Sequence, residues 1–257
     1  MHFELMTGPE VGDAIAADTP LILPVGSIEQ HGPHLPLGTD SFVPHALAER
    51  VAERRSALVM PPLMYAAYSR PRSGGGRTFA GSIGIRGATL AAVVNDVCAD
   101  LMRLGHRRIL VLNGHFENQW NLLEGLEDAI AGREATHKVL LVAWWDQVLP
   151  DDIARILGDS FPGWEREHAS LTETSIMEAL RPELVRRGLK ADGGAPRVLT
   201  YEALPTPPDT IWPTGVGYSA VGASGEIGET LVSVIVEWIV GIIDREFGPP
   251  VAVPGER

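Results

Sequence analysis

The chain has 257 residues, 45% of them hydrophobic, and its 21 lysine and arginine residues against 33 aspartate and glutamate residues give a formal net charge of −12. This composition predicts a folded globular protein with a sizeable core and excludes a disordered chain. Because phosphate groups are bound by cationic side chains, the acidic balance argues against nucleic acid or an anionic membrane as the main partner.

Short runs rich in β-branched residues alternate with longer segments of helical periodicity. The short runs predict buried strands of a mostly parallel sheet. They lie at 21–25, 56–63, 107–113 and 138–145. The longer segments have apolar residues at three- and four-residue intervals, which is typical of the crossover helices that connect parallel strands. They lie at 44–55, 88–105 and 118–132.

This order of strands and helices predicts an α/β protein with a three-layer α/β/α architecture around a mostly parallel central sheet. The length is near the upper end for one hydrophobic core, so we expect residues 1–257 to form a single domain. Near the C-terminus, the apolar segment 231–243 predicts a core helix, because it is too short to span a bilayer and contains Glu237.

Two long segments, 66–87 and 186–224, are rich in glycine, proline, serine and arginine. Loops of this length in a compact domain commonly form the walls or the lid of a site, and a disordered connection is the alternative.

The chain carries one cysteine, Cys98, which excludes an internal disulfide and lies within an apolar helical pattern. We therefore expect a buried core residue and a reducing compartment, the cytoplasm. The first thirty residues lack a basic segment followed by an apolar one, so no signal peptide is expected.

Acidic and imidazole side chains follow two of the predicted strands. Glu29, His31 and Asp40 come after the first strand, and His115 and Glu117 come directly after the third. In open α/β sheets the ligand crevice lies at the carboxyl ends of the strands, so we expect these residues at one edge of the sheet.

The two His and Glu pairs have a spacing of two residues, which projects both side chains to the same side of an extended segment. Carboxylate oxygen and neutral imidazole suit zinc, manganese and related divalent ions. With Asp40, whose two oxygens can bridge, the pairs supply enough ligands for two ions. The alternative is that the pairs are solvated and that Asp40 only caps a helix starting near Pro44.

A third polar segment, 163–175, adds Glu167, His168 and Glu173.

We do not expect the remaining histidines to bind a metal ion. We expect His34 to hydrogen-bond a metal ligand, and His45, at the start of a helical pattern, is compatible with the core. The histidines expected to face solvent, because they lie at a terminus or beside charged residues, are His2, His106 and His137.

Four motifs together resemble the creatininase family of metal-dependent amidohydrolases. They are LPVGSIEQHGPHLPLGTD at 23–40, NGHFEN at 113–118, WWD at 144–146 and GWEREH at 163–168. The last three resemble the members that hydrolyse creatinine more than the wider family, whose second motif usually reads Asn-Gly-His-Gly-Gly-Asn. The similarity covers about residues 15–180, and more loosely the glycine-rich stretch around 215–230.

The resemblance implies the layered α/β/α fold, a homohexamer, and two divalent metal ions per chain, zinc or manganese, bridged by Asp40. One ion would be held by Glu29, Asp40 and His115, and the other by His31, Asp40 and Glu117.

The resemblance also implies a substrate slot walled by Trp145 and Trp164, with His168 close to the scissile amide. Glu117 and Glu173 are further candidates for catalytic roles, and Glu173 matches an acid of the family that either ligates or orients near the metals.

Trp144 and Trp145 end a predicted strand, where side chains alternate, so we expect only one of them to face the crevice. The motif position favours Trp145. We assign no functional role to Trp120, Trp212 or Trp238.

The substrate prediction depends on two departures from the family pattern. Phe116 stands where the members that hydrolyse creatinine have a tyrosine. The loop 73–82, in which Ser73, Gly74 and Gly75 are candidates for substrate contacts, lacks the histidine and the Phe-Pro-Gly-Thr run usual in the family. Because a site built around a polar contact rejects analogues strongly, these changes leave room for a different substrate.

The leading prediction is a metal-dependent amidohydrolase that opens a cyclic amide, creatinine to creatine, by attack of a hydroxide that bridges the metals. His168 would pass a proton to the departing nitrogen. One alternative is a family hydrolase acting on another small molecule, such as a formamide, a cyclic sugar ketone or a small peptide. The other is a non-catalytic scaffold with the same fold.

Overall fold

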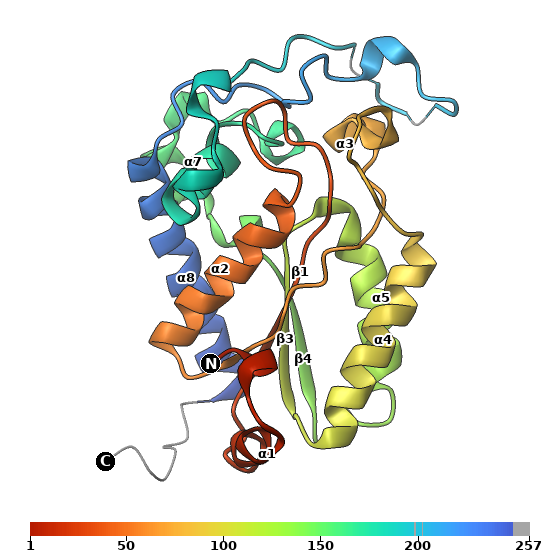
Figure 1. Cartoon of the computed structure of the whole chain (residues 1–257), viewed down its shortest axis with the longest axis vertical. Coiled ribbons are helices and arrows are strands. Elements are labelled where there is room, and N and C mark those ends of the chain that lie inside the picture. Colours follow the sequence, from red (N-terminus) through yellow and green to blue (C-terminus); the bar gives the residue numbers. More distant parts are fainter. Residues whose placement is uncertain (198, 202, 249–257) are drawn as a thin grey trace.

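A parallel sheet lies at the centre of the molecule, with helices on both of its faces (Figure 1). The computed structural model describes residues 1–197, 199–201 and 203–248. In this part of the chain the sheet has four strands in the order β2-β1-β3-β4, and every neighbouring pair is parallel. The strands are β1 (Leu21–Val25), β2 (Leu58–Val59), β3 (Arg108–Asn113) and β4 (Lys138–Ala143).

The helices confirm the alternation predicted from periodicity. The described residues form α1 (Gly8–Ala16), α2 (Thr39–Arg54), α3 (Pro71–Gly74), α4 (Gly87–Leu104), α5 (Gln119–Ile130), α6 (Pro150–Ile156), α7 (Leu171–Leu180) and α8 (Gly225–Phe247).

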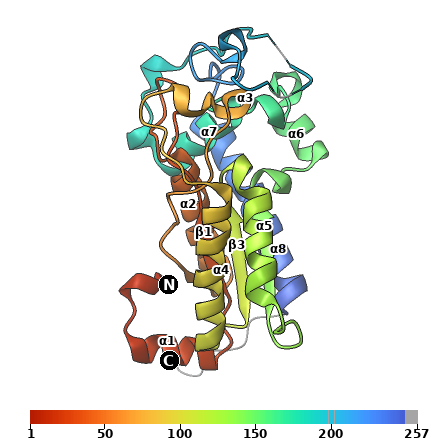
Figure 2. The ribbon, with the colours of Figure 1, turned by 90° about the vertical axis from the view of Figure 1, so that its right-hand side faces the viewer.

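Side-chain alternation along the strands divides the core between the two faces of the sheet. In β1, Ile22 belongs to one buried cluster, whereas Leu21 and Leu23 belong to the other. The first cluster includes residues of α2, α7 and α8, and the second includes residues of α4 and α5. Figure 2 shows this second layer from its outer side, with α4 and α5 running along the sheet. The predicted three-layer α/β/α architecture is therefore confirmed.

Two element bounds differ from the predictions because of proline. The segment 56–63 forms only the two-residue strand β2, since Pro61 and Pro62 have no N–H to donate to a sheet. Helix α2 begins at Thr39, earlier than expected, and Pro44 lies inside it. Because Pro44 lacks an N–H, the main-chain carbonyl of Asp40, four residues earlier, has no helical donor.

The two long loops lie together beyond the carboxyl ends of the strands, at the top of Figure 1. The segment 66–87 contains α3 and a 3-10 turn at Gly76–Thr78. The described part of 186–224 contains short 3-10 turns and no longer helix or strand. Both loops are thus placed where they can wall a site at this edge.

Helix α8 confirms the core helix predicted from the apolar segment 231–243. None of the helices formed by residues 1–197, 199–201 and 203–248 has the length and apolarity needed to cross a membrane.

Cys98 is fully buried in the second cluster, as predicted, and burial raises the pKa of its thiol to about 12. The prediction for His106 is wrong, because its side chain is buried. The N-terminal segment folds over it, with the ring of Phe3 5.9 Å from the imidazole centroid.

Candidate metal centre

Four short segments bring polar side chains together beyond the carboxyl ends of β1 and β3. Glu29 and His31 lie in the loop after β1, Asp40 lies in the first turn of α2, and His115 lies two residues after β3. Glu173, in the first turn of α7, joins them. All five side chains are buried, at the position where open α/β sheets form their ligand crevice.

Asp40 lies between two histidines. Its Oδ1 is 2.9 Å from Nε2 of His31, and its Oδ2 is 2.9 Å from Nδ1 of His115. Each histidine faces a second carboxylate: Oε1 of Glu29 is 3.1 Å from Nδ1 of His115, and Oε2 of Glu173 is 3.8 Å from Nε2 of His31. The arrangement gives two triads that share Asp40, each with its donor atoms within 4.8 Å of one another.

The structure brings Glu173, and not Glu117, into the triad of His31 and Asp40. Glu117 lies on the opposite side of the His115 ring, with its Oε2 3.2 Å from Nε2. The chain forms a 3-10 turn at Phe116–Asn118, and both side chains line the same cavity, but Glu117 meets the nitrogen of His115 that does not contact Asp40.

Glu117 is held by the loop that carries α3. Its Oε1 accepts a hydrogen bond of 3.0 Å from the main-chain N–H of Arg70, and it also accepts one from the hydroxyl of Ser73. A carboxylate fixed next to the second nitrogen of a histidine orients that ring and raises its basicity. Glu117 therefore ties the orientation of His115 to the loop 66–87.

Two glycines allow the strand ends to approach α2 at Asp40. A Cβ atom at Gly26 would lie 2.4 Å from the main-chain oxygen of Asp40, and one at Gly114 would lie 2.1 Å from the same oxygen. This is the carbonyl that Pro44 leaves without a helical donor. The first turn of α2 is thus seated against the backbone at the ends of both central strands.

Burial and mutual attraction set the charges of the cluster. Burial raises the pKa of Glu29 to about 7 and that of Glu173 to about 8. Burial opposes charge on His31, but Asp40 outweighs it and raises the pKa of His31 to about 10. For His115 burial is likewise outweighed by carboxylates, first Glu29, and its pKa is well above the ordinary value. The charged form of both imidazoles is therefore favoured, whereas burial favours the neutral acid form of Glu173 and, less strongly, of Glu29.

The donor atoms fit divalent metal ions. Oε2 of Glu29 is buried and makes no hydrogen bond within the described part of the chain. Buried polar atoms are normally hydrogen-bonded, and a bound ion is one of the few explanations for an exception next to two histidines. Carboxylate and imidazole donors without thiolate suit zinc or manganese.

His168 lies beside both triads and is contacted by Gln30. Its Nε2 is 2.9 Å from the main-chain oxygen of Gln30 and 3.0 Å from the side-chain Nε2 of the same residue, while its Nδ1 is 3.8 Å from Oε1 of Glu29. Burial, followed by the charge of His31, lowers the pKa of His168 to about 3. His168 is therefore a neutral imidazole next to charged ones.

His34, expected to hydrogen-bond a metal ligand, instead contacts the hydroxyl of Thr174 at 2.8 Å through its Nε2. Thr174 directly follows Glu173 in α7. His34 thus supports the helix that carries Glu173 rather than the carboxylate itself.

A cavity of about 610 Å³ adjoins the cluster and includes Glu29, Asp40, His115 and Glu173 in its lining. The sequence-predicted walls, Trp145 and Trp164, both line it. So do the aromatic and loop residues Phe116, Ser73 and Arg70.

Gly74 and Gly75, the other two candidates in this loop, shape its backbone. Gly74 ends α3, and Gly75 adopts a left-handed backbone conformation with φ of +75°, which favours glycine. Arg77 lies over the ring of Tyr68, at 4.8 Å from its centroid.

Sequence reasoning missed two tryptophans. Trp144 lines the cavity together with Trp145, because β4 ends at Ala143 and Trp144 has helical backbone angles, so strand alternation no longer applies. Trp212, from the long loop 186–224, also lines the cavity and stacks on His168 with ring centroids 5.9 Å apart. The Trp-Trp-Asp motif was a signal for Trp144, whereas nothing in the local sequence marked Trp212.

Comparison with known proteins gives consistent matches. A sequence profile of the creatininase family, described as creatinine amidohydrolase, matches residues 4–243. The chain is 39% identical over 241 residues to creatinine amidohydrolase from Pseudomonas putida, covering 91% of this chain and 92% of that protein. The structure is similar to that of a manganese creatininase, with a TM-score of 0.92, 38% identity, and coverage of 96% of this chain and 99% of that chain.

A more distant relative is a peptidase. The chain is 34% identical over 174 residues to the mycofactocin precursor peptide peptidase of Mycolicibacterium smegmatis, covering 63% of this chain and 58% of that protein.

Proposed function

The chain belongs to the creatininase family of hydrolases, and from this premise we propose that it is a metal-dependent amidohydrolase that opens a cyclic amide, with creatinine as its substrate. The observation that carries the proposal is the position of Asp40, which directs each carboxylate oxygen at a different buried histidine, with a further carboxylate beside each. A bridging carboxylate between two histidine and carboxylate pairs is the donor arrangement that a pair of divalent ions requires.

The two triads define the ligands of the proposed ions. Glu29, Asp40 and His115 would hold one ion, and His31, Asp40 and Glu173 the other. Glu117 then acts from outside, by orienting His115. Bound zinc or manganese supplies a water of lowered pKa as nucleophile and a Lewis acid for the carbonyl oxygen of the amide.

His168 is the proposed proton carrier. Its Nδ1 faces the cluster. Gln30 can hydrogen-bond the other ring nitrogen, Nε2, whether or not it carries a proton: the main-chain oxygen of Gln30 accepts from a protonated Nε2, and the side-chain amide of Gln30 donates to an unprotonated one. The amide orientation of Gln30 is fixed, because its Oε1 accepts from the N–H of Gly32 and its Nε2 donates to the carbonyl of Gly215. His168 can therefore accept a proton at Nδ1 and return it to the departing nitrogen.

The tryptophans suit a flat, delocalised substrate. Trp144 contacts both Trp145 and Trp164 edge to face, at centroid distances of 5.8 and 5.9 Å. A ring such as a cyclic guanidine could stack on these faces, and a cationic one would gain roughly 0.5–2 kcal/mol.

Metal binding to chelator-treated protein is expected to release protons. The pKa of His31 is raised to about 10 and that of Glu173 to about 8, so both groups hold protons at pH 7.5 that they must lose to ligate, and the raised pKa of His115 acts in the same direction. Apparent zinc affinity should therefore rise with pH, by about tenfold per pH unit for each proton released. Calorimetric titration in buffers of different ionisation enthalpy measures the number of protons released per zinc ion. A binding heat that does not depend on the buffer would contradict the assignment of these residues as ligands.

Purified protein is expected to convert creatinine to creatine, as measured by chromatographic detection of the product. The matched control is Asp40→Asn protein prepared in the same way, which excludes a contaminating enzyme. A short peptide amide is the second candidate, because the cavity of about 610 Å³ is larger than a single five-membered ring requires. Turnover of peptides or formamides without turnover of creatinine would keep the hydrolase and replace its substrate. The homohexamer and the cytoplasmic location expected from the sequence stay predictions.

A further inference from the structure

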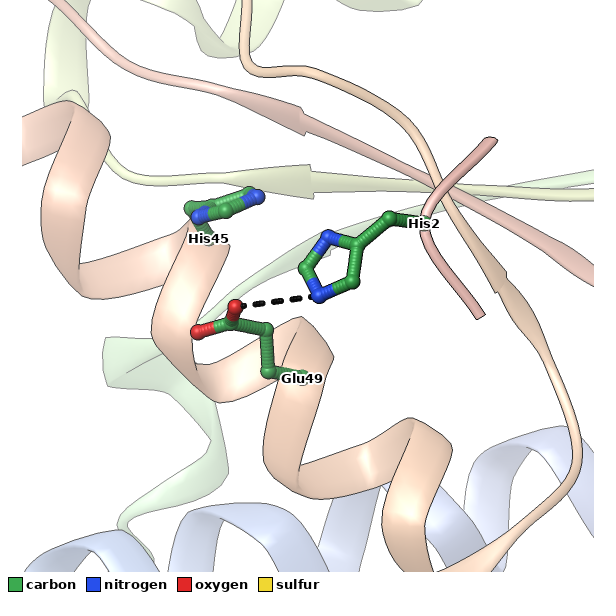
Figure 3. Close-up of side chains that lie close together, drawn as sticks. All are labelled: His2, His45 and Glu49. Atoms are coloured by element: carbon green, nitrogen blue, oxygen red, sulfur yellow. Dashed lines mark ion pairs between the residues drawn. The ribbon is translucent and has the colours of Figure 1, made fainter. Parts of the chain in front are cut away.

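A second group of potential metal ligands lies where the N-terminal segment meets α2. It consists of His2, His45 and Glu49 (Figure 3). His45 and Glu49 are four residues apart on α2, so they share one face of the helix. Asp40 is five positions before His45, which corresponds to a rotation of about 140° around the helix axis, so the group faces away from the catalytic cluster.

The three side chains point toward one another. Nε2 of His2 is 3.4 Å from Oε1 of Glu49, the contact drawn in Figure 3, and the rings of His2 and His45 are tilted with centroids 5.9 Å apart. One donor atom from each residue lies within 4.8 Å of the other two. Zinc with bonds of about 2.0–2.1 Å needs donors roughly 3.4 Å apart. Because all three residues are only half-buried, small rotations of their side chains can shorten the donor-to-donor distances from at most 4.8 Å to roughly 3.4 Å.

The position of His2 is fixed by the sheet rather than left to a free terminus. His2 forms a parallel bridge with Val59 of β2, and the N–H of Val59 donates a hydrogen bond of 2.8 Å to the carbonyl of Met1. The terminal segment therefore presents the ring of His2 to α2 at a defined place.

The second polar atoms of His2 and Glu49 face charged side chains. Oε2 of Glu49 is 3.5 Å from Nη2 of Arg181, which leaves Oε1 toward His2. Nδ1 of His2 is 3.9 Å from Oε1 of Glu4, which leaves Nε2 toward Glu49. Metal-binding histidines and carboxylates usually have such partners at their second atom, because these partners fix the orientation of the ligand.

Two of the three residues are open to the surface. His2 and Glu49 line a surface hollow of about 430 Å³ that also includes Arg50, Glu53 and Arg181. Burial lowers the pKa of His45, with smaller contributions of both signs from Glu49, His2 and Arg181, so its ring is neutral at pH 7. Two imidazoles and one carboxylate are donors for zinc and similar transition ions, whereas magnesium and calcium prefer oxygen donors.

We propose that His2, His45 and Glu49 form a zinc-type site, separate from the catalytic cluster, that fastens the N-terminal segment to α2. Three protein ligands leave the fourth tetrahedral position to water. The role is structural, since the tryptophan-lined cavity beside the catalytic cluster does not include any of the three.

The test is zinc titration of chelator-treated Asp40→Asn protein, in which the catalytic cluster lacks its bridging carboxylate. One zinc ion per chain is expected to bind, and zinc is expected to raise the melting temperature. Adding His45→Gln or Glu49→Gln should weaken this binding more than about 10-fold and remove the thermal shift. Adding His137→Gln, a half-buried histidine outside the group, should leave both unchanged within about twofold.

The native cluster serves as the second background. In protein with Asp40 intact, His45→Gln should lower the number of bound zinc ions by one per chain, as measured by mass spectrometry under native conditions. If His45→Gln fails to fold, as judged by circular dichroism, His2→Gln on the terminal segment replaces it. Equal zinc binding by the His45, Glu49 and His137 variants would overturn the proposal, whatever the outcome for the catalytic cluster.

Discussion

Asp40→Asn protein is expected to lose both catalytic metal ions and to show no turnover above background. Asparagine keeps the shape of the side chain, but it replaces one of the two oxygens that face His31 and His115 with an amide nitrogen and removes the negative charge. Removing a residue that only hydrogen-bonds a metal ligand typically lowers metal affinity by about 10–100-fold. Loss of a ligand shared by both ions should therefore lower metal affinity by more than about 100-fold. Metal content after gel filtration and the rate of amide hydrolysis measure the two effects.

The matched control is Asp100→Asn, which removes an exposed carboxylate on α4 that pairs with Arg103. This variant should keep the metal content and the activity of the native chain. Circular dichroism checks that the Asp40 variant is folded. Full hydrolytic activity in folded Asp40→Asn protein would show that the two-ion assignment is wrong.

His168→Gln is expected to reduce kcat by about 10²–10⁴-fold, the usual contribution of a general acid or base, while both metal ions stay bound. The reason is geometric: Nδ1 of His168 is directed toward the cluster, but the two triads are complete without it. Steady-state kinetics and metal analysis on the same sample provide the two readouts.

The structure also defines the result that would contradict this role. Donor atoms of Glu29, His31 and His168 lie within 4.8 Å of one another, so His168 is itself close enough to be a ligand. If His168→Gln loses an ion together with activity, His168 is a ligand and not the proton carrier. His137→Gln, at a surface turn beside Thr136, is the control for loss of a histidine elsewhere.

The layers of the fold could be predicted from periodicity, because β1 and β3 are continuous apolar runs and α4 and α5 have clear apolar faces. Element ends were less predictable. Because proline usually occupies the first turn of a helix, Pro44 indicated a helix start near residue 44. In the structure α2 starts at Thr39, and Pro44 lies further inside it.

The strand-end rule placed Glu29, His31, Asp40 and His115 together, since it depends only on the direction of parallel strands. It could not decide between Glu117 and Glu173. Glu117 follows His115 by two residues and contacts the nitrogen of that ring that does not face Asp40, whereas Glu173 comes from a helix more than a hundred residues after Asp40 and lies near His31. Local spacing carries no information about such a distant contact.

The same limit applies to the cavity walls. Trp212 reaches His168 from a long loop whose path is set by tertiary packing, and the sequence around it has no periodic signal. Trp145 was predicted through the family resemblance, and Trp164 through that resemblance and its position in a loop after Pro162 and Gly163.

Gly26 and Gly114 approach the carbonyl of Asp40 at the ends of the two central strands. The contacts at these two glycines involve the main chain of Asp40 and the residues Ser41 and Pro44, and they include no tryptophan of the cavity wall. The loops 66–87 and 186–224 supply walls of the cavity, including Ser73 and Trp212, and the first of them also holds Glu117 next to His115. A change in the loop 66–87 is therefore expected to alter the orientation of His115 as well as the surface offered to a substrate, whereas the contact at Asp40 stays the same.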